Sequence, residues 1–152
     1  MIVYVDGACS NVAKGQRQGS WGIYWRHNSV INSSGLCKYP PFTNSRAEAE
    51  ALLWVLVSHR NSNYYKQPLI AASDSAYVVN TMNQYRATWL WYPIPYRPGE
   101  MAVVNQSGNE VNCSDLWEKI ITEWDQLVVH IVHVRRMFNN GCLLYTSPSP
   151  RD

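Results

Sequence analysis

The chain has 152 residues, of which 46% are hydrophobic and 16% are charged, and its formal net charge is +2 at pH 7. This length and composition predict one globular domain, and they exclude an intrinsically disordered chain. The small net charge is compatible with a nucleic-acid partner but does not by itself indicate one. No apolar run is long enough to cross a bilayer, and the N-terminus lacks a signal-peptide pattern. We therefore expect a soluble monomer of the cytoplasm or nucleus with no membrane contact.

The cysteines and aromatic residues say little about function on their own. The four cysteines form no C-x-x-C pair and show no zinc spacing, which predicts free thiols in a reducing compartment. Seven Trp and ten Tyr residues are more than usual, and aromatic side chains can stack on bases or sugars. Most of them are nevertheless expected to lie in the core.

The first predicted element is a strand over Ile2–Val5, an apolar run typical of a strand that is covered on both faces. Asp6 and Gly7 follow as turn residues, so the Asp6 carboxylate is expected at the mouth of a central strand. A charge in that place needs a partner or a metal. The next segments predict the rest of an antiparallel meander: a loop at 11–19, strands at 20–26 and 29–36, and a turn at 27–28.

The clearest helix is predicted over residues 43–60, where apolar side chains recur with helical spacing. Ser45 is the predicted N-cap, and its spacing to Glu48 forms the capping box S-x-x-E. That motif would make Glu48 a residue that stabilises the start of the helix and has no catalytic or metal-binding role. A place in the first turn would also let Glu48 project toward the segment that precedes the helix.

Residues 68–74 repeat the pattern of the first strand, because an apolar run leads into the carboxylate of Asp74. A helix at 76–84 follows. A strand separated from the meander by a helix is expected to pair parallel to the first strand. Asp6 and Asp74 would then stand at the C-terminal ends of neighbouring parallel strands, where α/β sheets place their ligands.

The remaining segments predict a protruding loop at 86–112, a helix at 114–124 with Ser114 as its N-cap, and a last strand at 127–134. The predicted fold class is therefore α/β. It is a mixed five-stranded sheet, an antiparallel meander plus two parallel strands, flanked by helices.

Three motifs give the chain a resemblance to a known family. Asp6-Gly7 follows a strand, TNSRAE opens a helix, and SDSAYVVN follows another strand, in that order. Together with EVNCSDLWEKI and a strand that ends in His-Val, they resemble ribonuclease H of type 1, closest to its eukaryotic branch, over residues 2–134. The resemblance implies the ribonuclease H-like fold. It also implies an endonuclease that hydrolyses the RNA strand of RNA/DNA hybrids and leaves 5′-phosphate and 3′-hydroxyl ends.

The resemblance also assigns roles to particular residues. It implies that Asp6, Glu48 and Asp74 are the catalytic residues and hold two Mg²⁺ ions, for which Mn²⁺ can substitute. The residues implied for the RNA strand of the hybrid are Cys9, Asn11, Asn44 and Ser45. Those implied for the DNA strand are the aromatic channel of Tyr77, Tyr85 and Trp89 and the phosphate pocket of Thr43 and Asn112.

The pattern breaks toward the C-terminus. The family continues into a His-containing loop, a fourth catalytic Asp and a C-terminal helix, but the corresponding positions here fall near Met137 and Ser147. Residues 1–140 are therefore predicted to be an incomplete catalytic domain that lacks the C-terminal helix. Residues 141–152 are predicted to be a Ser/Pro tail that does not look native. On this interpretation the chain as written is poorly stable and weakly active.

Two alternatives stay open. A catalytically impaired module that binds RNA/DNA hybrids would keep the groove without turnover, and the missing fourth carboxylate favours it. A ribonuclease H domain detached from a reverse transcriptase polyprotein would carry the same motifs. Retention of Asp6, Glu48 and Asp74 favours the enzyme over the binding module.

Overall fold

A computed structural model describes residues 1–26 and 32–135 of the chain. The elements are, in chain order, β1 (Ile2–Ala13), β2 (Gln16–Trp25), β3 (Ser33–Leu36), α1 (Asn44–Arg60), β4 (Leu69–Ser73), α2 (Ala76–Asn83), the 3-10 helix η2 (Tyr85–Thr88), β5 (Leu90–Pro93), β6 (Met101–Val104), α3 (Ser114–Trp124) and β7 (Val129–His133). The predicted turn at 27–28, the predicted tail at 141–152 and the positions near Met137 and Ser147 lie outside the described residues.

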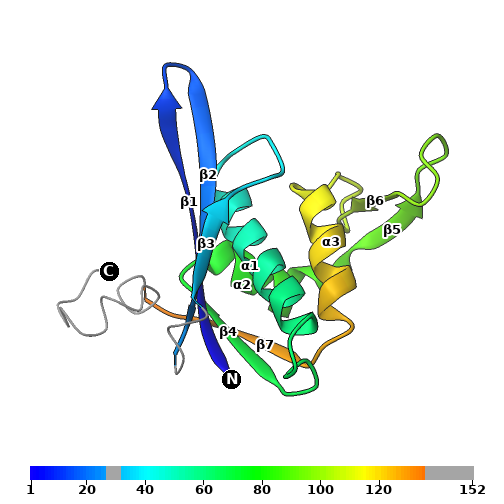
Figure 1. Cartoon of the computed structure of the whole chain (residues 1–152). Coiled ribbons are helices and arrows are strands. Elements are labelled where there is room, and N and C mark those ends of the chain that lie inside the picture. Colours follow the sequence, from blue (N-terminus) through cyan, green and yellow to red (C-terminus); the bar gives the residue numbers. More distant parts are fainter. Residues whose placement is uncertain (27–31, 136–152) are drawn as a thin grey trace.

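Five strands form one mixed sheet of order β3-β2-β1-β4-β7 (Figure 1). β1, β2 and β3 pair antiparallel, whereas β4 pairs parallel to β1 and β7 pairs parallel to β4. This arrangement confirms the predicted meander with two added parallel strands. The core joins the sheet to α1, where Val3, Val5, Leu52 and Leu56 are almost completely buried, and it includes buried side chains of α2 and α3. Within the described ranges, no helix has the length and apolar character needed to span a bilayer.

The first hairpin is longer than the sequence predicts. β1 continues through Asp6 and Gly7 to Ala13 and pairs with β2 as far as Ala13↔Gln16, so the predicted loop at 11–19 is wrong. Cross-strand hydrogen bonding holds these polar residues in a ladder that their weak strand propensity does not predict. The parallel ladder with β4, however, ends at Val5↔Ser73. Asp6 therefore still lies immediately beyond the parallel pairing.

The predicted loop at 86–112 is also only partly a loop. It contains the antiparallel hairpin β5–β6, which pairs from Leu90↔Val104 to Pro93↔Met101 and projects from the molecule (Figure 1). The Trp, Tyr and Val residues of this segment favour a strand. Gly99, with a φ of +83°, supplies the left-handed residue of the turn region between the two strands.

Candidate active site

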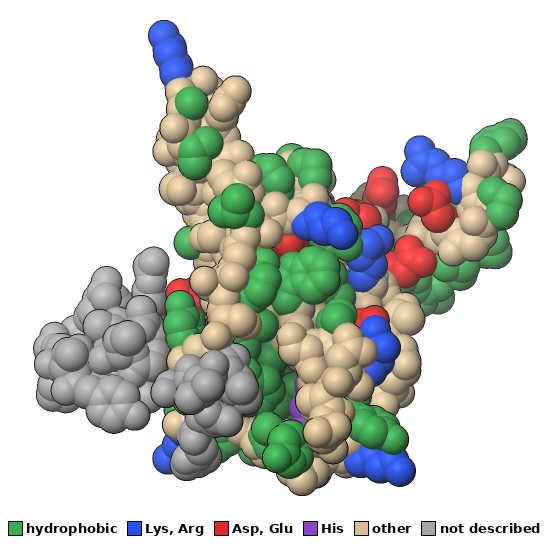
Figure 2. All heavy atoms as spheres, in the orientation of Figure 1, with side chains coloured by type: hydrophobic (Ala, Val, Ile, Leu, Met, Phe, Trp, Pro, Cys, Tyr) green, Lys and Arg blue, Asp and Glu red, His purple; other side chains and the backbone are tan. Residues whose placement is uncertain are grey.

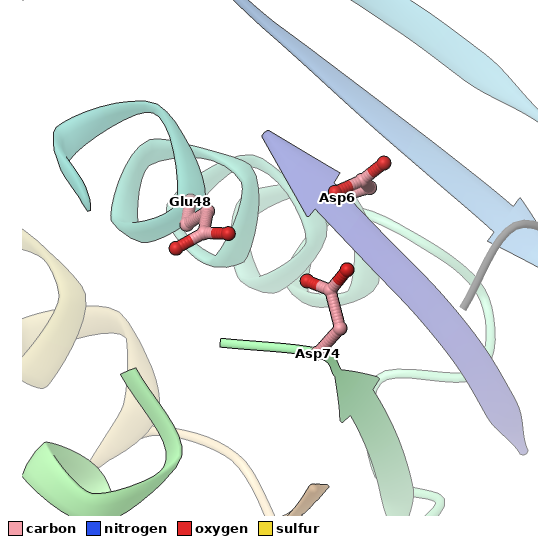
Figure 3. A group of neighbouring side chains, drawn as sticks. All are labelled: Asp6, Glu48 and Asp74. Atoms are coloured by element: carbon pink, nitrogen blue, oxygen red, sulfur yellow. The ribbon is translucent and has the colours of Figure 1, made fainter. Parts of the chain in front are cut away.

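Three carboxylates from separate elements come together beside the ends of the parallel strands. Asp6 lies in β1, Glu48 lies in α1, and Asp74 directly follows β4 (Figure 3). One carboxylate oxygen of each residue lies within 4.8 Å of the others. The structure therefore unites the three residues that the sequence selects as catalytic and metal-binding candidates.

Gly7 allows α1 to approach β1 closely enough to place Glu48. A Cβ atom at Gly7 would lie 2.2 Å from the backbone C and O of Ala47 and 2.5 Å from the backbone N of Glu48. Only a residue without a side chain permits this contact. The sequence pattern predicts Gly7 as a turn residue, but in the structure Gly7 lies within the strand and lets the backbone of α1 approach closely.

The N-terminus of α1 shows that Glu48 is not part of a capping box. The N-cap is Thr43, whose Oγ1 accepts a hydrogen bond of 3.2 Å from the backbone N–H of Arg46. The predicted N-cap, Ser45, already lies inside the helix, because the helix begins at Asn44. Glu48 therefore lies beyond the first turn and does not complete a capping box with Ser45.

Asp74 has an unsatisfied carboxylate oxygen. Its Oδ1 is buried and has no hydrogen-bond partner within the described part of the chain. Its backbone carbonyl lies 3.1 Å from Nε2 of His133, and Ser75 next to it caps α2. A buried carboxylate oxygen without a partner is costly, and three neighbouring carboxylates repel one another. A divalent cation with a preference for oxygen ligands would relieve both costs, so this donor set fits such an ion.

The residues predicted for the RNA strand lie beside this cluster, on β1 and at the start of α1. The Asn44 Oδ1 accepts a hydrogen bond of 2.9 Å from the backbone N–H of Cys9, and the Cys9 thiol donates to the Phe42 carbonyl at 3.3 Å. Ser45 follows Asn44 and is exposed. Asn11 lies farther out on β1, opposite Arg17. The structure thus joins Cys9 and Asn44, with Ser45 next to Asn44 in the helix, while Asn11 belongs to the projecting part of the hairpin.

Most of the residues predicted for the DNA strand line one groove of about 320 Å³: Tyr77, Tyr85, Trp89 and Asn112. Trp89 packs on Trp117 with a ring-centroid distance of 6.2 Å, and the Trp117 indole N–H donates to the Tyr77 hydroxyl at 3.1 Å. Burial raises the pKa of Tyr77 to about 12, so its phenol is neutral at pH 7. Thr43 is not part of this lining and sits instead at the N-cap of α1.

Arg46, which the sequence does not single out, joins the N-terminal ends of α1 and α3. Its guanidinium donates to both carboxylate oxygens of Asp115, at 2.9 and 2.8 Å, and to the carbonyls of Tyr39 and Pro40. Helix α3 begins at Ser114, so its N-cap is Cys113, which has a φ of 60°, and not the predicted Ser114. The pair therefore fixes the relative positions of the two helix ends that carry Thr43 and Asn112.

Replacement of Arg46 by Ala is expected to lower the free energy of unfolding by about 2 kcal/mol, because it removes a mostly buried bidentate partner. Arg46→Lys should recover only part of this loss, since an ammonium cannot form the same fork. Urea unfolding at pH 7 measures both changes. Equal stability of the Lys variant and the parent chain would contradict the bidentate assignment.

The same pair predicts a pH dependence. The Arg46 guanidinium holds the pKa of Asp115 below its ordinary value of 3.8. A carboxyl whose pKa is lowered on folding stabilises the protein above its unfolded pKa, and this contribution is lost as the pH falls through the folded pKa. The stability difference between the parent chain and Asp115→Asn should therefore shrink below about pH 4. A difference that stays constant down to pH 2 would contradict this prediction.

Comparisons with known proteins identify the family of this chain. The RNase H family model matches residues 1–136. Ribonuclease H of Chlorobium phaeobacteroides is 31% identical over 151 residues, which cover 93% of this chain and 89% of that protein. Mouse ribonuclease H1 is 28% identical over 89 residues, which cover 59% of this chain and 30% of that protein.

Solved structures show the same fold at lower identity. LC11-RNase H1 in complex with an RNA/DNA hybrid has a TM-score of 0.61 at 19% identity, covering 91% of this chain and 88% of that one. The foamy viral protease-reverse transcriptase in complex with dsDNA has a TM-score of 0.65 at 17% identity, covering 89% and 81%. With the family match spanning nearly the whole chain, this protein belongs to the RNase H family.

Proposed function

We propose that this protein is an endonuclease that hydrolyses the RNA strand of RNA/DNA hybrids. The observation that carries the proposal is the convergence of Asp6, Glu48 and Asp74, from three different elements, within 4.8 Å. Family membership supports the reaction class. A member of the same fold bound to an RNA/DNA hybrid supports the substrate class.

The three carboxylates would hold two divalent ions, Mg²⁺ in the first place, with Mn²⁺ as a substitute. When bound, such ions supply the positive charge that activates a water molecule and stabilises the leaving 3′ oxygen of a phosphodiester. The ligands are held in place by the strand ladder on one side and by the contact at Gly7 on the other. Cleavage of the P–O3′ bond leaves 5′-phosphate and 3′-hydroxyl ends.

Recognition of the RNA strand is assigned to Cys9, Asn11, Asn44 and Ser45, all uncharged residues that suit 2′-hydroxyl groups rather than phosphates. Asn44 uses its Oδ1 to hold the Cys9 backbone. Its amide NH₂ keeps two donors with no protein hydrogen bond within the described residues. Asn44 can therefore donate to a ribose hydroxyl while it positions β1 against α1.

Recognition of the DNA strand is assigned to the groove of Tyr77, Tyr85 and Trp89 and to the two helix ends at Thr43 and Asn112. Backbone N–H groups and the helix dipole favour a phosphate at such an end. The Thr43 hydroxyl oxygen accepts from the Arg46 N–H, so its proton can be donated to a phosphate.

The direct experiment compares a 5′-labelled RNA annealed to DNA with the same RNA annealed to RNA, in Mg²⁺ and separately in Mn²⁺. We expect metal-dependent cutting of the hybrid alone and products with 3′-hydroxyl ends. Equal cutting of the RNA duplex would contradict the substrate assignment. Hybrid binding without any cutting would favour the alternative of a catalytically impaired binding module.

A further inference from the structure

The β1–β2 hairpin extends beyond the rest of the sheet as a narrow arm, here defined as residues 10–19. β2 pairs with β3 only from Ser20↔Leu36 onward, so the arm has no third strand. Residues 10–17 are all exposed. Figure 1 shows the arm projecting past β3 and the helices. Because residues 10–17 are exposed, the arm contributes little to the core, so packing does not explain it.

The charged residues of the arm are all basic. Lys14 lies in its turn and Arg17 lies close by on β2, and residues 10–19 contain no Asp or Glu. These two charges equal the formal net charge of the whole chain, +2. Neither side chain has an ion-pair partner within residues 1–26 and 32–135, and Figure 2 shows a basic side chain at the end of the arm. Exposed cations without counter-charges attract a polyanion.

The arm presents these charges on an ordered ladder rather than on a long loop. The register continues through Asn11↔Arg17 and Ala13↔Gln16, with one irregularity at Val12. The turn is only Lys14-Gly15, and Gly15 adopts a φ of +73°. A ladder of this kind holds the two cations at a fixed distance from the sheet, so less conformational freedom is lost when they bind.

The arm lies next to the residues proposed to bind the RNA strand. It continues directly from Cys9, and it includes Asn11. Lys14 follows Asp6 by eight positions along the chain, roughly 25 Å at the usual rise of a strand. One strand of a duplex presents a phosphate about every 3.4 Å, so this length corresponds to several nucleotides.

The second projection of the molecule carries no comparable charge. The arm and the β5–β6 hairpin flank the N-terminal ends of α1 and α3 at the same end of the molecule (Figure 1). The basic residue of the β5–β6 hairpin, Arg97, already lies 3.7 Å from Glu100. Of the two projections, only the arm therefore carries basic side chains without an ion-pair partner in the described structure.

We propose that Lys14 and Arg17 form a second contact with the hybrid, in which they bind phosphates of the RNA strand several nucleotides from the cleaved bond. The inference rests on the proposed function, because it assumes that the hybrid occupies the site at Asp6, Glu48 and Asp74. The arm adds affinity and sets the length of duplex that binds well. It takes no part in the bond cleavage itself.

The test measures equilibrium binding of a labelled hybrid of about 20 base pairs, in EDTA to prevent cutting, over a series of salt concentrations. Each exposed ion pair contributes up to about fivefold, so the double variant Lys14→Gln/Arg17→Gln should bind roughly tenfold more weakly. The slope of log K against log salt should fall in magnitude by about 2, one for each lost phosphate contact. The single variant Lys66→Gln removes one exposed charge from the α1–β4 connection and should leave the slope unchanged.

The strand is identified by replacing single phosphates with neutral methylphosphonates. A methylphosphonate at a contacted position of the RNA strand should weaken binding of the hybrid to the parent chain. The same replacement should not change binding of the hybrid to the double variant. An unchanged salt slope, or coupling to the DNA strand alone, would overturn the proposal. If the parent chain cuts hybrids normally while the slope is unchanged, only the arm contact fails. If the parent chain neither binds nor cuts hybrids, the proposed function fails with it.

Discussion

Asp74→Asn is expected to reduce metal-dependent cleavage of the hybrid by about a thousandfold, which corresponds to roughly 4 kcal/mol of lost transition-state stabilisation. The variant keeps the shape of the side chain but removes one of three clustered negative charges. It also replaces the buried oxygen that has no hydrogen-bond partner in the described structure with a weaker ligand. Single-turnover cleavage in Mg²⁺ measures the effect.

The fold should survive this change. Without metal, loss of one like charge relieves repulsion in the cluster, so Asp74→Asn should unfold at the same temperature as the parent chain or higher. Cleavage at the parental rate by a folded Asp74→Asn chain would contradict the assignment of this residue as a catalytic metal ligand.

Gly7→Ala is expected to damage both stability and activity. The added Cβ would lie 2.2 Å from backbone atoms of Ala47, and no side-chain rotation can relieve a clash with backbone. β1 and α1 must therefore move apart, which should lower the free energy of unfolding by about 3 kcal/mol. The movement carries Glu48 away from Asp6, and a displacement of about 1 Å at a catalytic group can reduce the rate about a hundredfold.

Gly108→Ala is the matched control. Gly108 has a φ of +83°, but a Cβ there would meet nothing within 4 Å. This variant should lose only about 1 kcal/mol, from the left-handed backbone conformation, and should cleave normally. Urea unfolding and cleavage assays on both variants separate the two effects. Equal losses of stability in the two variants would show that the contact between Gly7 and α1 is not tight.

The fold and two of the three carboxylates are predictable from local sequence patterns. At both Asp6 and Asp74 an apolar run ends in an acidic residue, and the crossover through a helix makes the two strands parallel. Glu48 is ambiguous in the sequence, because S-x-x-E is also a capping box. Its place becomes clear only when the helix start at Asn44 and the contact at Gly7 are known.

Other features depend on contacts between distant residues and leave no local signal. The ladder beyond Asp6 is stabilised by pairing between strands, since residues 10–19 are mostly polar residues and glycines with weak strand propensity. Arg46 and Asp115 are 69 residues apart, and neither position predicts the other. The number of aromatic residues does not predict the groove at Tyr77 and Trp89, whereas the family resemblance does.

One carboxylate on α1 provides an internal control for the metal centre. Glu50 lies two residues from Glu48, is only 1% exposed, and accepts hydrogen bonds from the backbone N–H groups of Lys38 and Tyr39 and from the Trp54 indole. The hydrogen bonds of this carboxylate stabilise the connection between β3 and α1. Glu50→Gln should therefore lower the free energy of unfolding by about 2 kcal/mol, because hydrogen bonds to a charged acceptor are lost.

The metal centre is tested most directly by the shift in unfolding temperature that Mn²⁺ causes in the parent chain, in Glu48→Gln and in Glu50→Gln. A ligand at a hundred times its dissociation constant stabilises the folded state by about 2.7 kcal/mol, a shift of roughly 5–10 °C for a chain of this size. We expect Glu50→Gln to unfold at a lower temperature yet keep the full shift. We expect Glu48→Gln to keep its metal-free unfolding temperature and lose most of the shift. A full shift in Glu48→Gln would show that the cluster of Asp6, Glu48 and Asp74 is not the metal centre.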